Sequence, residues 1–479
     1  MRYRIDLLIV TPKRRTRTMN WREVFRKKTY APEKRFLRRL GLLDLTLLGM
    51  GAIIGAGIFV ITGKAAATMA GPGIVFSFIL GAITIGISAL VYAELGSTYP
   101  VSGSAYSYSY VTIGEIVAWI VGWELLLEYG IATSTVASGW SGYLRRFLEE
   151  SLGVHIPLAI SGAYDPASGT YIDFFAFFIV ILIFILLTVG IKKSAVVNSI
   201  IVGIKIIILL LFVSFGLASI KLSNFKVFLP YGWSGVWHAS SLIVFAYLGF
   251  DAVSTVAEET KNPKKNLPLG LVLSLAISTF FYIVVSLALT GMVSYKKLDV
   301  PDALAFAMYQ ANHPFVASII SLGAVITILS VMLVMGLGFT RVAFALARDG
   351  LLFKGLADIH ERFKTPYKAT ICGGILLSLL AGLVPLRTLA ELVNIGTLFA
   401  YFIAGISVII SRRNPNTSST FKIPCITILM PVNLALLMLI MAGLPLITWL
   451  RFVLWTTTGL FIYFMYGFKH SNVRRKAAK

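Results

Sequence analysis

Apolar runs of about 20 residues recur along almost the whole chain after residue 42. A membrane-spanning α-helix needs about 20 such residues, because each residue rises about 1.5 Å and the hydrocarbon core is about 30 Å thick. The composition agrees, with 57% hydrophobic and 13% charged residues and a mean hydropathy of +0.84. We therefore predict an all-α integral membrane protein with twelve transmembrane helices. The expected spans are 43–66, 72–96, 115–143, 171–191, 194–220, 236–258, 268–294, 314–340, 369–386, 388–411, 423–446 and 449–468.

The net charge of +22 is unevenly distributed along the chain. With twelve spans, the termini and every second loop lie on one side, and these segments hold most of the 43 Lys and Arg residues. This positive-inside pattern predicts a multi-pass protein of the cell membrane with both termini in the cytoplasm. Residues 1–42 then form a basic cytosolic arm and 469–479 a cytosolic tail, although a start at Met19 would make residues 1–18 an upstream extension. A nucleic-acid partner is disfavoured, since no aromatic-rich folded module accompanies the basic segments.

The residues that usually support metal, redox or hydrolytic chemistry are sparse. Cys372 and Cys425 provide no disulfide framework, and the five histidines are scattered without metal-ligand spacing. The sequence contains no phosphate-binding P-loop motif. We therefore expect neither an enzyme nor a bound cofactor.

The first span is weakened by four glycines between Gly49 and Gly57. Each glycine costs a helix interior roughly 0.5–1 kcal/mol relative to alanine, so a local break is favoured there. Free backbone groups at membrane depth persist only where they line a cavity or are buried in protein, and such breaks mark solute sites in transporters. The alternative is a helix pair packed closely through small residues.

The sixth span repeats this pattern, with Gly, Asp, Ser and Thr in the middle of residues 245–255. The first and sixth spans each begin a set of five, which fits an inverted five-plus-five repeat with two broken helices side by side. We expect one repeat over 43–220, a second over 221–411, and two additional helices over 412–468.

Three ionisable residues inside expected spans are of particular interest. Glu124 and Glu128 are four residues apart and share one face of the third helix. Lys205 is the single charge in the middle of the fifth span, where its burial costs at least about 2.5–3.5 kcal/mol. We interpret Lys205 as a proton carrier and Glu128 as part of a proton or substrate path. Structural roles, a hydrogen bond for Glu128 and a fixed cation for Lys205, remain the alternatives.

Several motifs together resemble the amino acid–polyamine–organocation superfamily, and in particular the bacterial branch of its cationic amino acid transporter family. The resemblance covers residues 42 to about 468. The motifs are GAIIGAGIF at 51–59, LEY at 127–129, GFDAVST at 249–255, EETKNP at 258–263 and ARDGLL at 347–352.

This resemblance implies the leucine-transporter-type fold, with substrate bound between broken helices 1 and 6. The substrate carboxylate would meet the backbone of Ile53, Ile54, Gly55, Ala56 and Gly57, at the N-terminus of a half-helix. The α-ammonium would meet the carbonyls of Ile53, Phe245, Ala246 and Leu248, and the Phe245 ring would close over the substrate.

The same resemblance places Lys205 where sodium-coupled relatives hold a sodium ion, with Glu128 near it, and so favours the proton as coupling ion. Ala56 departs from relatives, which often have Thr or Ser there, so one carboxylate hydrogen bond is in doubt. Met335 stands where eukaryotic cationic members resemble one another in having a smaller residue, which predicts a shorter pocket.

We therefore expect a proton-coupled symporter that takes up small-to-medium L-amino acids by alternating access. The second hypothesis is a cationic amino-acid transporter, and the third is an amino-acid/polyamine exchanger or a sodium-coupled carrier. A membrane amino-acid sensor that moves no substrate is a more distant alternative. The expected partners are the amino acid, membrane lipid and, as an open question, a small accessory membrane protein.

Overall fold

The computed structural model describes residues 24–29, 36–55, 57–300, 302–385, 394–415, 419–444 and 446–477. These residues form helices and contain no β-strand beyond three isolated bridges. The α-helices are α1 (Leu42–Ile53), α2 (Thr62–Ala65), α3 (Ile74–Thr98), α4 (Ala105–Thr112), α5 (Glu115–Leu152), α6 (Phe174–Val189), α7 (Ile191–Ala218), α8 (Gly232–Val244), α9 (Pro263–Met292), α10 (Ala303–Gln310), α11 (Pro314–Arg348), α12 (Tyr367–Leu383), α14 (Asn394–Arg412), α15 (Ile426–Ala442), α16 (Leu446–Ile462), α17 (Phe468–His470) and α18 (Asn472–Ala477).

Short 3-10 and π-helical segments connect or continue these helices. They are η2 (Gly57–Ile61), η3 (Ala66–Ala70), η4 (Gly71–Gly73), η5 (Leu158–Ile160), η6 (Pro166–Ser168), η7 (Leu222–Phe225), η8 (Phe245–Tyr247), η9 (Phe250–Glu259), η10 (Tyr295–Lys297), η11 (Lys354–Ala357) and η12 (Tyr463–Gly467).

Local sequence signals set several helix ends. Pro263 and Pro314 occupy the first positions of α9 and α11, where the missing N–H costs no hydrogen bond. The Asp173 carboxylate caps α6 by accepting a hydrogen bond from Ala176 N at 3.0 Å. At the end of α5, Gly153 adopts the left-handed conformation (φ +63°) that commonly stops a helix.

Seven helical segments of the described chain are long and apolar enough to cross a membrane. Four shorter apolar helices, α1, α6, α12 and α15, accompany them. The long segments are Thr62–Thr98, Glu115–Arg145, Lys192–Ala218, Pro263–Met292, Pro314–Arg348, Ile395–Arg412 and Leu446–Arg475.

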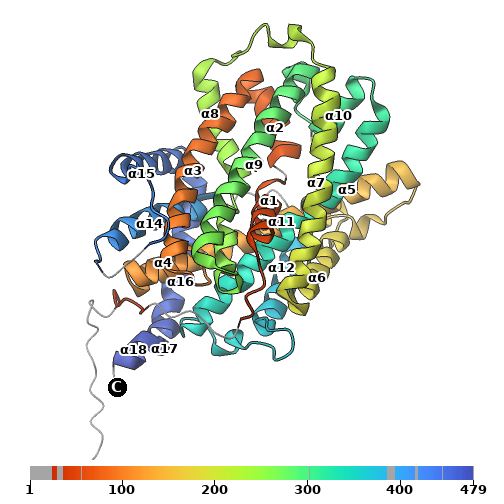
Figure 1. Ribbon diagram of the computed structural model, residues 1–479. Helices are drawn as coiled ribbons and strands as arrows, with labels where there is room; N and C mark the ends of the chain where they lie inside the picture. Colours follow the sequence, from red (N-terminus) through yellow and green to blue (C-terminus); the bar gives the residue numbers. More distant parts are fainter. Residues whose placement is uncertain are drawn as a thin grey trace, which may run out of the picture.

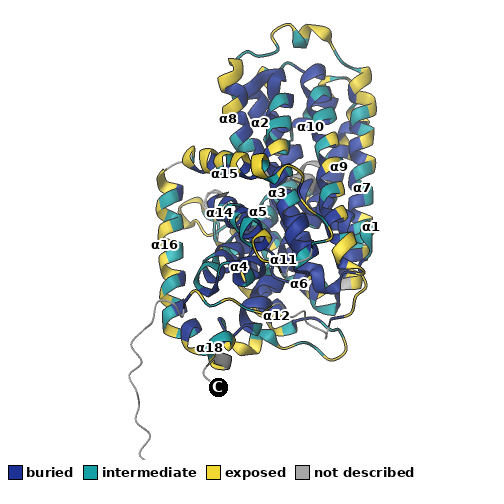
Figure 2. Cartoon of the chain, turned by 60° about the vertical axis from the view of Figure 1, so that its left-hand side comes forward, coloured by how far each residue is buried: buried dark blue, intermediate teal, exposed yellow. Residues whose placement is uncertain are grey.

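The helices form a bundle in which α1 packs against α7, α9 and α11 (Figure 1). Large apolar side chains such as Leu450, Leu454 and Phe461 remain exposed on the outer helix α16 (Figure 2). An exposed apolar surface of this extent is typical of helices that face lipid.

Residues 24–29 and 36–40, which we call the strap, lie across one end of the bundle. This end, the strap end, also holds α17 and α18 at the bottom of Figure 1, since Asn472 N donates to Asp349 O at 3.0 Å. The strap is held by backbone hydrogen bonds to segments far away in the sequence. They run from Ile116 N to Val24 O (2.9 Å), Glu115 N to Arg26 O (3.1 Å), Arg39 N to Glu259 O (2.8 Å) and Lys261 N to Leu40 O (2.8 Å).

Candidate functional site

Two helix interruptions meet in the middle of the bundle. The first lies between α1, which ends at Ile53, and η2, which begins at Gly57. The second lies between α8 and η9, around η8 and Gly249. A Cβ atom on Gly57 would lie 2.4 Å from the Cβ and 2.8 Å from the Cα of Ala246. The two interrupted backbones therefore touch, and only glycine fits at the point of contact.

The Tyr282 hydroxyl on α9 bridges the two interruptions. It lies 2.6 Å from the carbonyl oxygen of Ile53 and 2.8 Å from that of Ala246. These are two of the carbonyls that the sequence analysis assigned to a substrate ammonium group. The single hydroxyl proton of Tyr282 is thus shared between the two carbonyls, and a ligand would have to displace it.

Lys205 on α7 reaches the first interruption from the other side. Its buried ammonium donates to the Ile54 carbonyl, lies 2.7 Å from Ser330 Oγ, and lies 3.5 Å from the Gly51 carbonyl. Within the described part of the chain it forms no ion pair, with Glu128 or any other carboxylate. The structure thus shows the expected approach of Lys205 to the first helix. Among the described residues, however, Lys205 makes no direct contact with Glu128.

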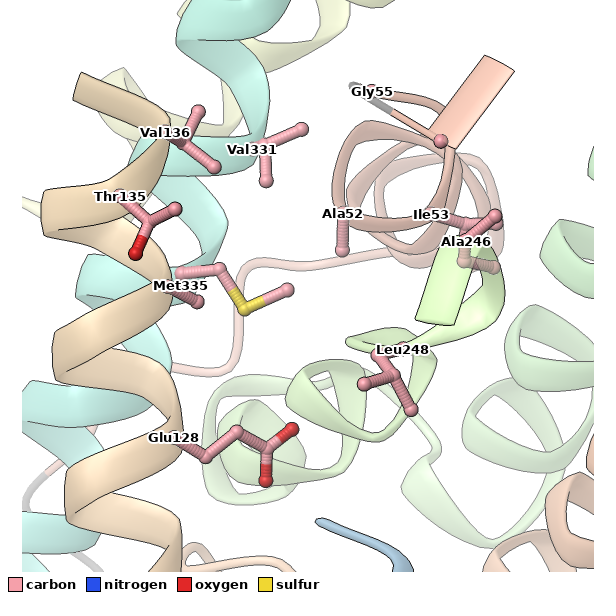
Figure 3. Close-up of a pocket in the computed structure, with 12 residues that line it drawn as sticks. Ala52, Ile53, Gly55, Glu128, Thr135, Val136, Ala246, Leu248, Val331 and Met335 are labelled. Atoms are coloured by element: carbon pink, nitrogen blue, oxygen red, sulfur yellow. The ribbon is translucent and has the colours of Figure 1, made fainter. Parts of the chain in front are cut away.

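A cavity of about 60 Å³ lies beside both interruptions (Figure 3). By the same measure one water molecule needs about 10–15 Å³, so the cavity has room for a few waters or a small solute part. Its wall is mainly apolar and comes from α1, η2, α5, α11 and the second interruption. The lining residues are Ala52, Ile53, Gly55, Gly57, Glu128, Ala132, Thr135, Val136, Ala246, Leu248, Val331 and Met335.

Two polar side chains of the cavity wall have unused hydrogen-bonding capacity. Among the described residues, neither Glu128 Oε2 nor Thr135 Oγ1 has a hydrogen-bond partner, although both atoms are buried. Figure 3 shows both side chains on α5, opposite Ala52 and Leu248. Buried polar atoms are nearly always satisfied, so these two oxygens are candidates for contacts with a bound molecule or ordered water.

Met335 on α11 projects its thioether between Ala52 and Leu248 and narrows the cavity (Figure 3). Its methyl group packs on Gly249, where a Cβ atom would lie 2.0 Å from Met335 Cε. Gly249 also has a φ of +94°, which other residues rarely adopt. The methionine therefore fills space that the second interruption leaves open.

Asp251 is the acceptor of a buried hydrogen-bond cluster, and the sequence analysis did not single it out as a site residue. Its carboxylate accepts hydrogen bonds from Tyr129 Oη, from Ser104 Oγ at 3.2 Å and from Tyr401 Oη at 3.2 Å. These donors come from α5, the residue before α4, and α14. The motif GFDAVST contained the signal, but its aspartate was interpreted only as a helix-breaking residue.

The cavity thus brings together most of the residues assigned from the sequence to substrate binding. Ile53, Gly55, Gly57, Ala246, Leu248 and Met335 all line it. Ile54 lies beside it and accepts the lysine hydrogen bond. Ala56 and the side chain of Phe245 lie outside the described residues. Within the described ranges, no cluster of three His, Cys, Asp or Glu residues could hold a metal ion.

Two ion pairs join η9 to α11 at the strap end. Arg341 and Glu259, each about 1% exposed, pair at 2.5 Å, and the Phe36 ring of the strap covers the guanidinium at 5.0 Å. Arg348 pairs with Glu258 at 2.9 Å. Glu258 and Glu259 begin the motif EETKNP, and Arg348 belongs to ARDGLL, whereas Arg341 lies earlier on α11.

The strap also forms an ion pair with the end of α11. Lys28 forms an ion pair with Asp349, which also accepts a hydrogen bond from Tyr106 Oη at 2.8 Å. Burial lowers the pKa of Lys28, and the neighbouring Asp349 charge opposes this shift. The strap is therefore attached to the bundle by both side chains and backbone.

Comparison with known proteins identifies relatives over nearly the whole chain. The model of the family described as "Amino acid permease" matches residues 40–468. The methylthioribose transporter of Bacillus subtilis is 44% identical over 94% of this chain and 99% of its own. The branched-chain amino acid permease BcaP of the same organism is also 44% identical, with the same shares covered. Human cationic amino acid transporter 4 is 36% identical over 78% of this chain and 60% of its own.

Proposed function

The chain belongs to the amino acid permease family and is a multi-pass membrane transporter rather than an enzyme, and we propose that it imports small-to-medium neutral L-amino acids together with protons. The observation that carries this proposal is the mainly apolar cavity bordered by both helix interruptions, with Lys205 hydrogen-bonded to the same backbone from behind.

For the membrane topology we propose twelve spans, arranged as the inverted five-plus-five repeat with α1–η2 and α8–η9 as the broken first and sixth helices. The contact between Gly57 and Ala246 supports this arrangement. We further assign the strap end to the cytoplasm of the cell. Cytoplasmic segments are enriched in Lys and Arg, and the strap end holds the cationic residues Arg39, Lys192, Lys193 and Arg362. Lys296 and Lys297 belong instead to η10, between α9 and α10.

In the proposed mechanism, the substrate ammonium displaces the Tyr282 hydroxyl from the carbonyls of Ile53 and Ala246. The carboxylate then faces the backbone between Gly55 and Gly57. The side chain lies toward Thr135 and Met335, whose apolar surroundings favour a neutral group. A carbonyl pair suits an ammonium ion because charge-assisted hydrogen bonds are roughly twice as strong as neutral ones.

Lys205 would link this site to the proton gradient. When protonated, it donates to the Ile54 carbonyl and Ser330 and so holds the end of α1. Loss of its proton removes both the charge and a donor, which loosens the attachment of α1 to α7 and α11. Among the described residues it has no carboxylate partner, so these hydrogen bonds, rather than an ion pair, hold its ammonium group.

The test is uptake of radiolabelled L-alanine into proteoliposomes under an imposed inward proton gradient. We expect accumulation by the wild type, loss of at least tenfold in Lys205→Ala, and no change in Lys64→Ala, whose side chain is exposed on α2. Retained alanine binding in Lys205→Ala, measured by thermal shift, would separate coupling from folding. Equal accumulation by wild type and Lys205→Ala would refute the proton-carrier role.

The coupling mode needs its own controls. Uptake that follows a sodium gradient without a pH gradient would favour a sodium-coupled carrier. Alanine entry that occurs only when the vesicles contain an amino acid or polyamine would favour an exchanger. Binding without any entry would favour the sensor.

Competition with unlabelled solutes tests the substrate class. We expect alanine, valine and leucine to compete, as the relationship to a branched-chain amino acid permease suggests. Competition by arginine alone would support the cationic alternative, which the unpaired Glu128 Oε2 on the cavity wall favours. Methylthioribose is a further candidate because of the equally similar methylthioribose transporter. It lacks an ammonium group, so its uptake would not require displacement of Tyr282.

A further inference from the structure

A second cavity, of about 280 Å³, lies at the strap end, away from the proposed substrate site. It is bounded by the strap, by the turn between α6 and α7, and by the segment that precedes α12. The lining residues are Leu37, Arg39, Val189, Gly190, Lys192, Lys193, Glu259, Arg362, Phe363 and Lys364.

The wall of this cavity is strongly basic. Its cationic side chains are Arg39, Lys192, Lys193, Arg362 and Lys364, and none of them forms an ion pair with the residues that the structure describes. The carboxylate of the wall, Glu259, already pairs with Arg341 at 2.5 Å. Several cations around one concave space favour a multiply hydrogen-bonded anion, and phosphate is the group that Arg and Lys both bind well.

The position of the cavity indicates that the phosphate belongs to a lipid. It opens at the end of α6 and the start of α7, two helices with exposed apolar faces. The exposed side chains on α6 include Phe178 (48% exposed) and Ile185 (55%). Those on α7 include Ile200 (58%) and Ile207 (66%). Acyl chains can lie along these faces while the headgroup enters the basic cavity, as basic pockets between transmembrane helices on the cytoplasmic side allow.

We propose that this cavity is a binding site for the phosphate headgroup of an anionic phospholipid. Arg39 belongs to the strap and its backbone N–H donates to the Glu259 carbonyl at 2.8 Å. A bound headgroup therefore connects the strap with the α6–α7 turn and the segment before α12. This holds the strap against the bundle and stabilises the closed strap end.

The experiment is native mass spectrometry of the purified full-length protein, titrated with phosphatidylglycerol or with phosphatidylcholine. We expect phosphatidylglycerol to bind the wild type more tightly. Each cation near an anionic surface contributes about a fivefold factor, so Lys192→Gln/Lys193→Gln is expected to weaken binding about 25-fold. The matched control, Lys296→Gln/Lys297→Gln, removes the same charge from η10 and is expected to leave binding unchanged.

Two further measurements make the result specific. Lys192→Arg/Lys193→Arg keeps the charge and is expected to retain binding, and size-exclusion profiles of all variants report folding. Titration with inorganic pyrophosphate tests a soluble source. Tight, lysine-dependent pyrophosphate binding without phosphatidylglycerol binding would keep the phosphate site and refute the lipid assignment. Equal lipid binding by wild type and the Gln pair, or equal losses in the Gln pair and its control, would overturn the proposal.

Discussion

The middle of the bundle and its strap end are held together by different interactions. In the middle, Lys205 and Tyr282 donate to backbone carbonyls of the helix interruptions, and no ion pair among the described residues is involved. At the strap end, Arg341 and Arg348 pair with Glu259 and Glu258, and the strap lies over the first pair.

Under the proposed function, this difference corresponds to what each region has to do. At an interruption, a backbone carbonyl can exchange the hydrogen bond from a lysine or tyrosine for one from a ligand or another donor. The net cost is small, since one hydrogen bond replaces another. A buried ion pair cannot exchange partners in this way, and removing one member leaves an uncompensated charge. The middle is therefore suited to substrate exchange, and the strap end to a two-state closure.

The largest effect is expected from Arg341→Ala at the strap end. It leaves Glu259 buried without its partner, which costs about 3–5 kcal/mol in the closed form. We expect lower thermal stability and faster maleimide labelling of Ser102→Cys, a position that is buried in the structure. The background carries Cys372→Ser and Cys425→Ser, since both cysteines are exposed.

A double variant, Glu259→Leu/Arg341→Met, provides the control for this prediction. Apolar side chains of similar size are expected to recover most of the lost stability, because neither charge remains buried. If Arg341→Ala alone has no effect on labelling, the ion pair does not close this end and the proposed contrast between the two regions fails.

Tyr282→Phe addresses the middle of the bundle. Loss of the hydroxyl leaves the carbonyls of Ile53 and Ala246 without a donor, at a cost of about 1–3 kcal/mol. A substrate ammonium would supply the missing donor, so the substrate-induced rise in melting temperature is expected to be larger than in wild type. The matched control is Tyr247→Phe, whose hydroxyl donates to the Phe78 carbonyl on α3 instead. A smaller substrate-induced rise in Tyr282→Phe would contradict displacement.

Met335→Ser tests how the cavity selects its ligand. Removing the thioether from between Ala52 and Leu248 enlarges the cavity and adds a hydroxyl, so arginine binding is expected to strengthen about tenfold, or 1.4 kcal/mol. Isothermal titration with arginine and alanine measures the change. Met332→Ser, on the same helix and outside the cavity lining, serves as the control. Absence of any gain for arginine would remove the size argument.

Lys28→Gln is expected to have the smallest effect. The Lys28 side chain is 20% exposed, and burial lowers its pKa, so dehydration offsets much of its attraction to Asp349. The loss is about 1 kcal/mol or less, seen as slightly faster Ser102→Cys labelling. The exposed neighbour Lys27 provides the control as Lys27→Gln. An effect as large as that of Arg341→Ala would mean that the strap, rather than the buried pair, determines closure.

The parts of this architecture that depend on local sequence could be predicted. The glycine cluster located the interruption at the end of α1, because weak helix propensity is encoded residue by residue. Lys205 could be singled out because a lone charge in an apolar run is costly wherever the chain folds. The helix bounds were less certain: α11 extends to Arg348, beyond the expected 340, since it continues past the apolar run into the strap end.

The features that were missed depend on contacts between distant segments. Tyr282 occupies an unremarkable position in an apolar helix, and only the packing of α9 against α1 reveals its two carbonyls. The basic arm was expected, but its hydrogen bonds to residues 115–116 and 259–261 use backbone atoms, which leave no sequence pattern. Asp251 likewise gains its hydrogen-bond donors only when the fold brings Tyr129 on α5 and Tyr401 on α14 next to it.

The strap has a consequence for how the protein is made. Lys28 is synthesised early, yet its partner Asp349 follows 321 residues later, and Asn472, which binds the Asp349 carbonyl, comes later still. At about 5–20 residues per second, the ribosome needs roughly 16–64 s to cover the first of these separations. During this interval the arm has no docking place, so it docks among the last steps of assembly, once the helices to which it binds have been inserted.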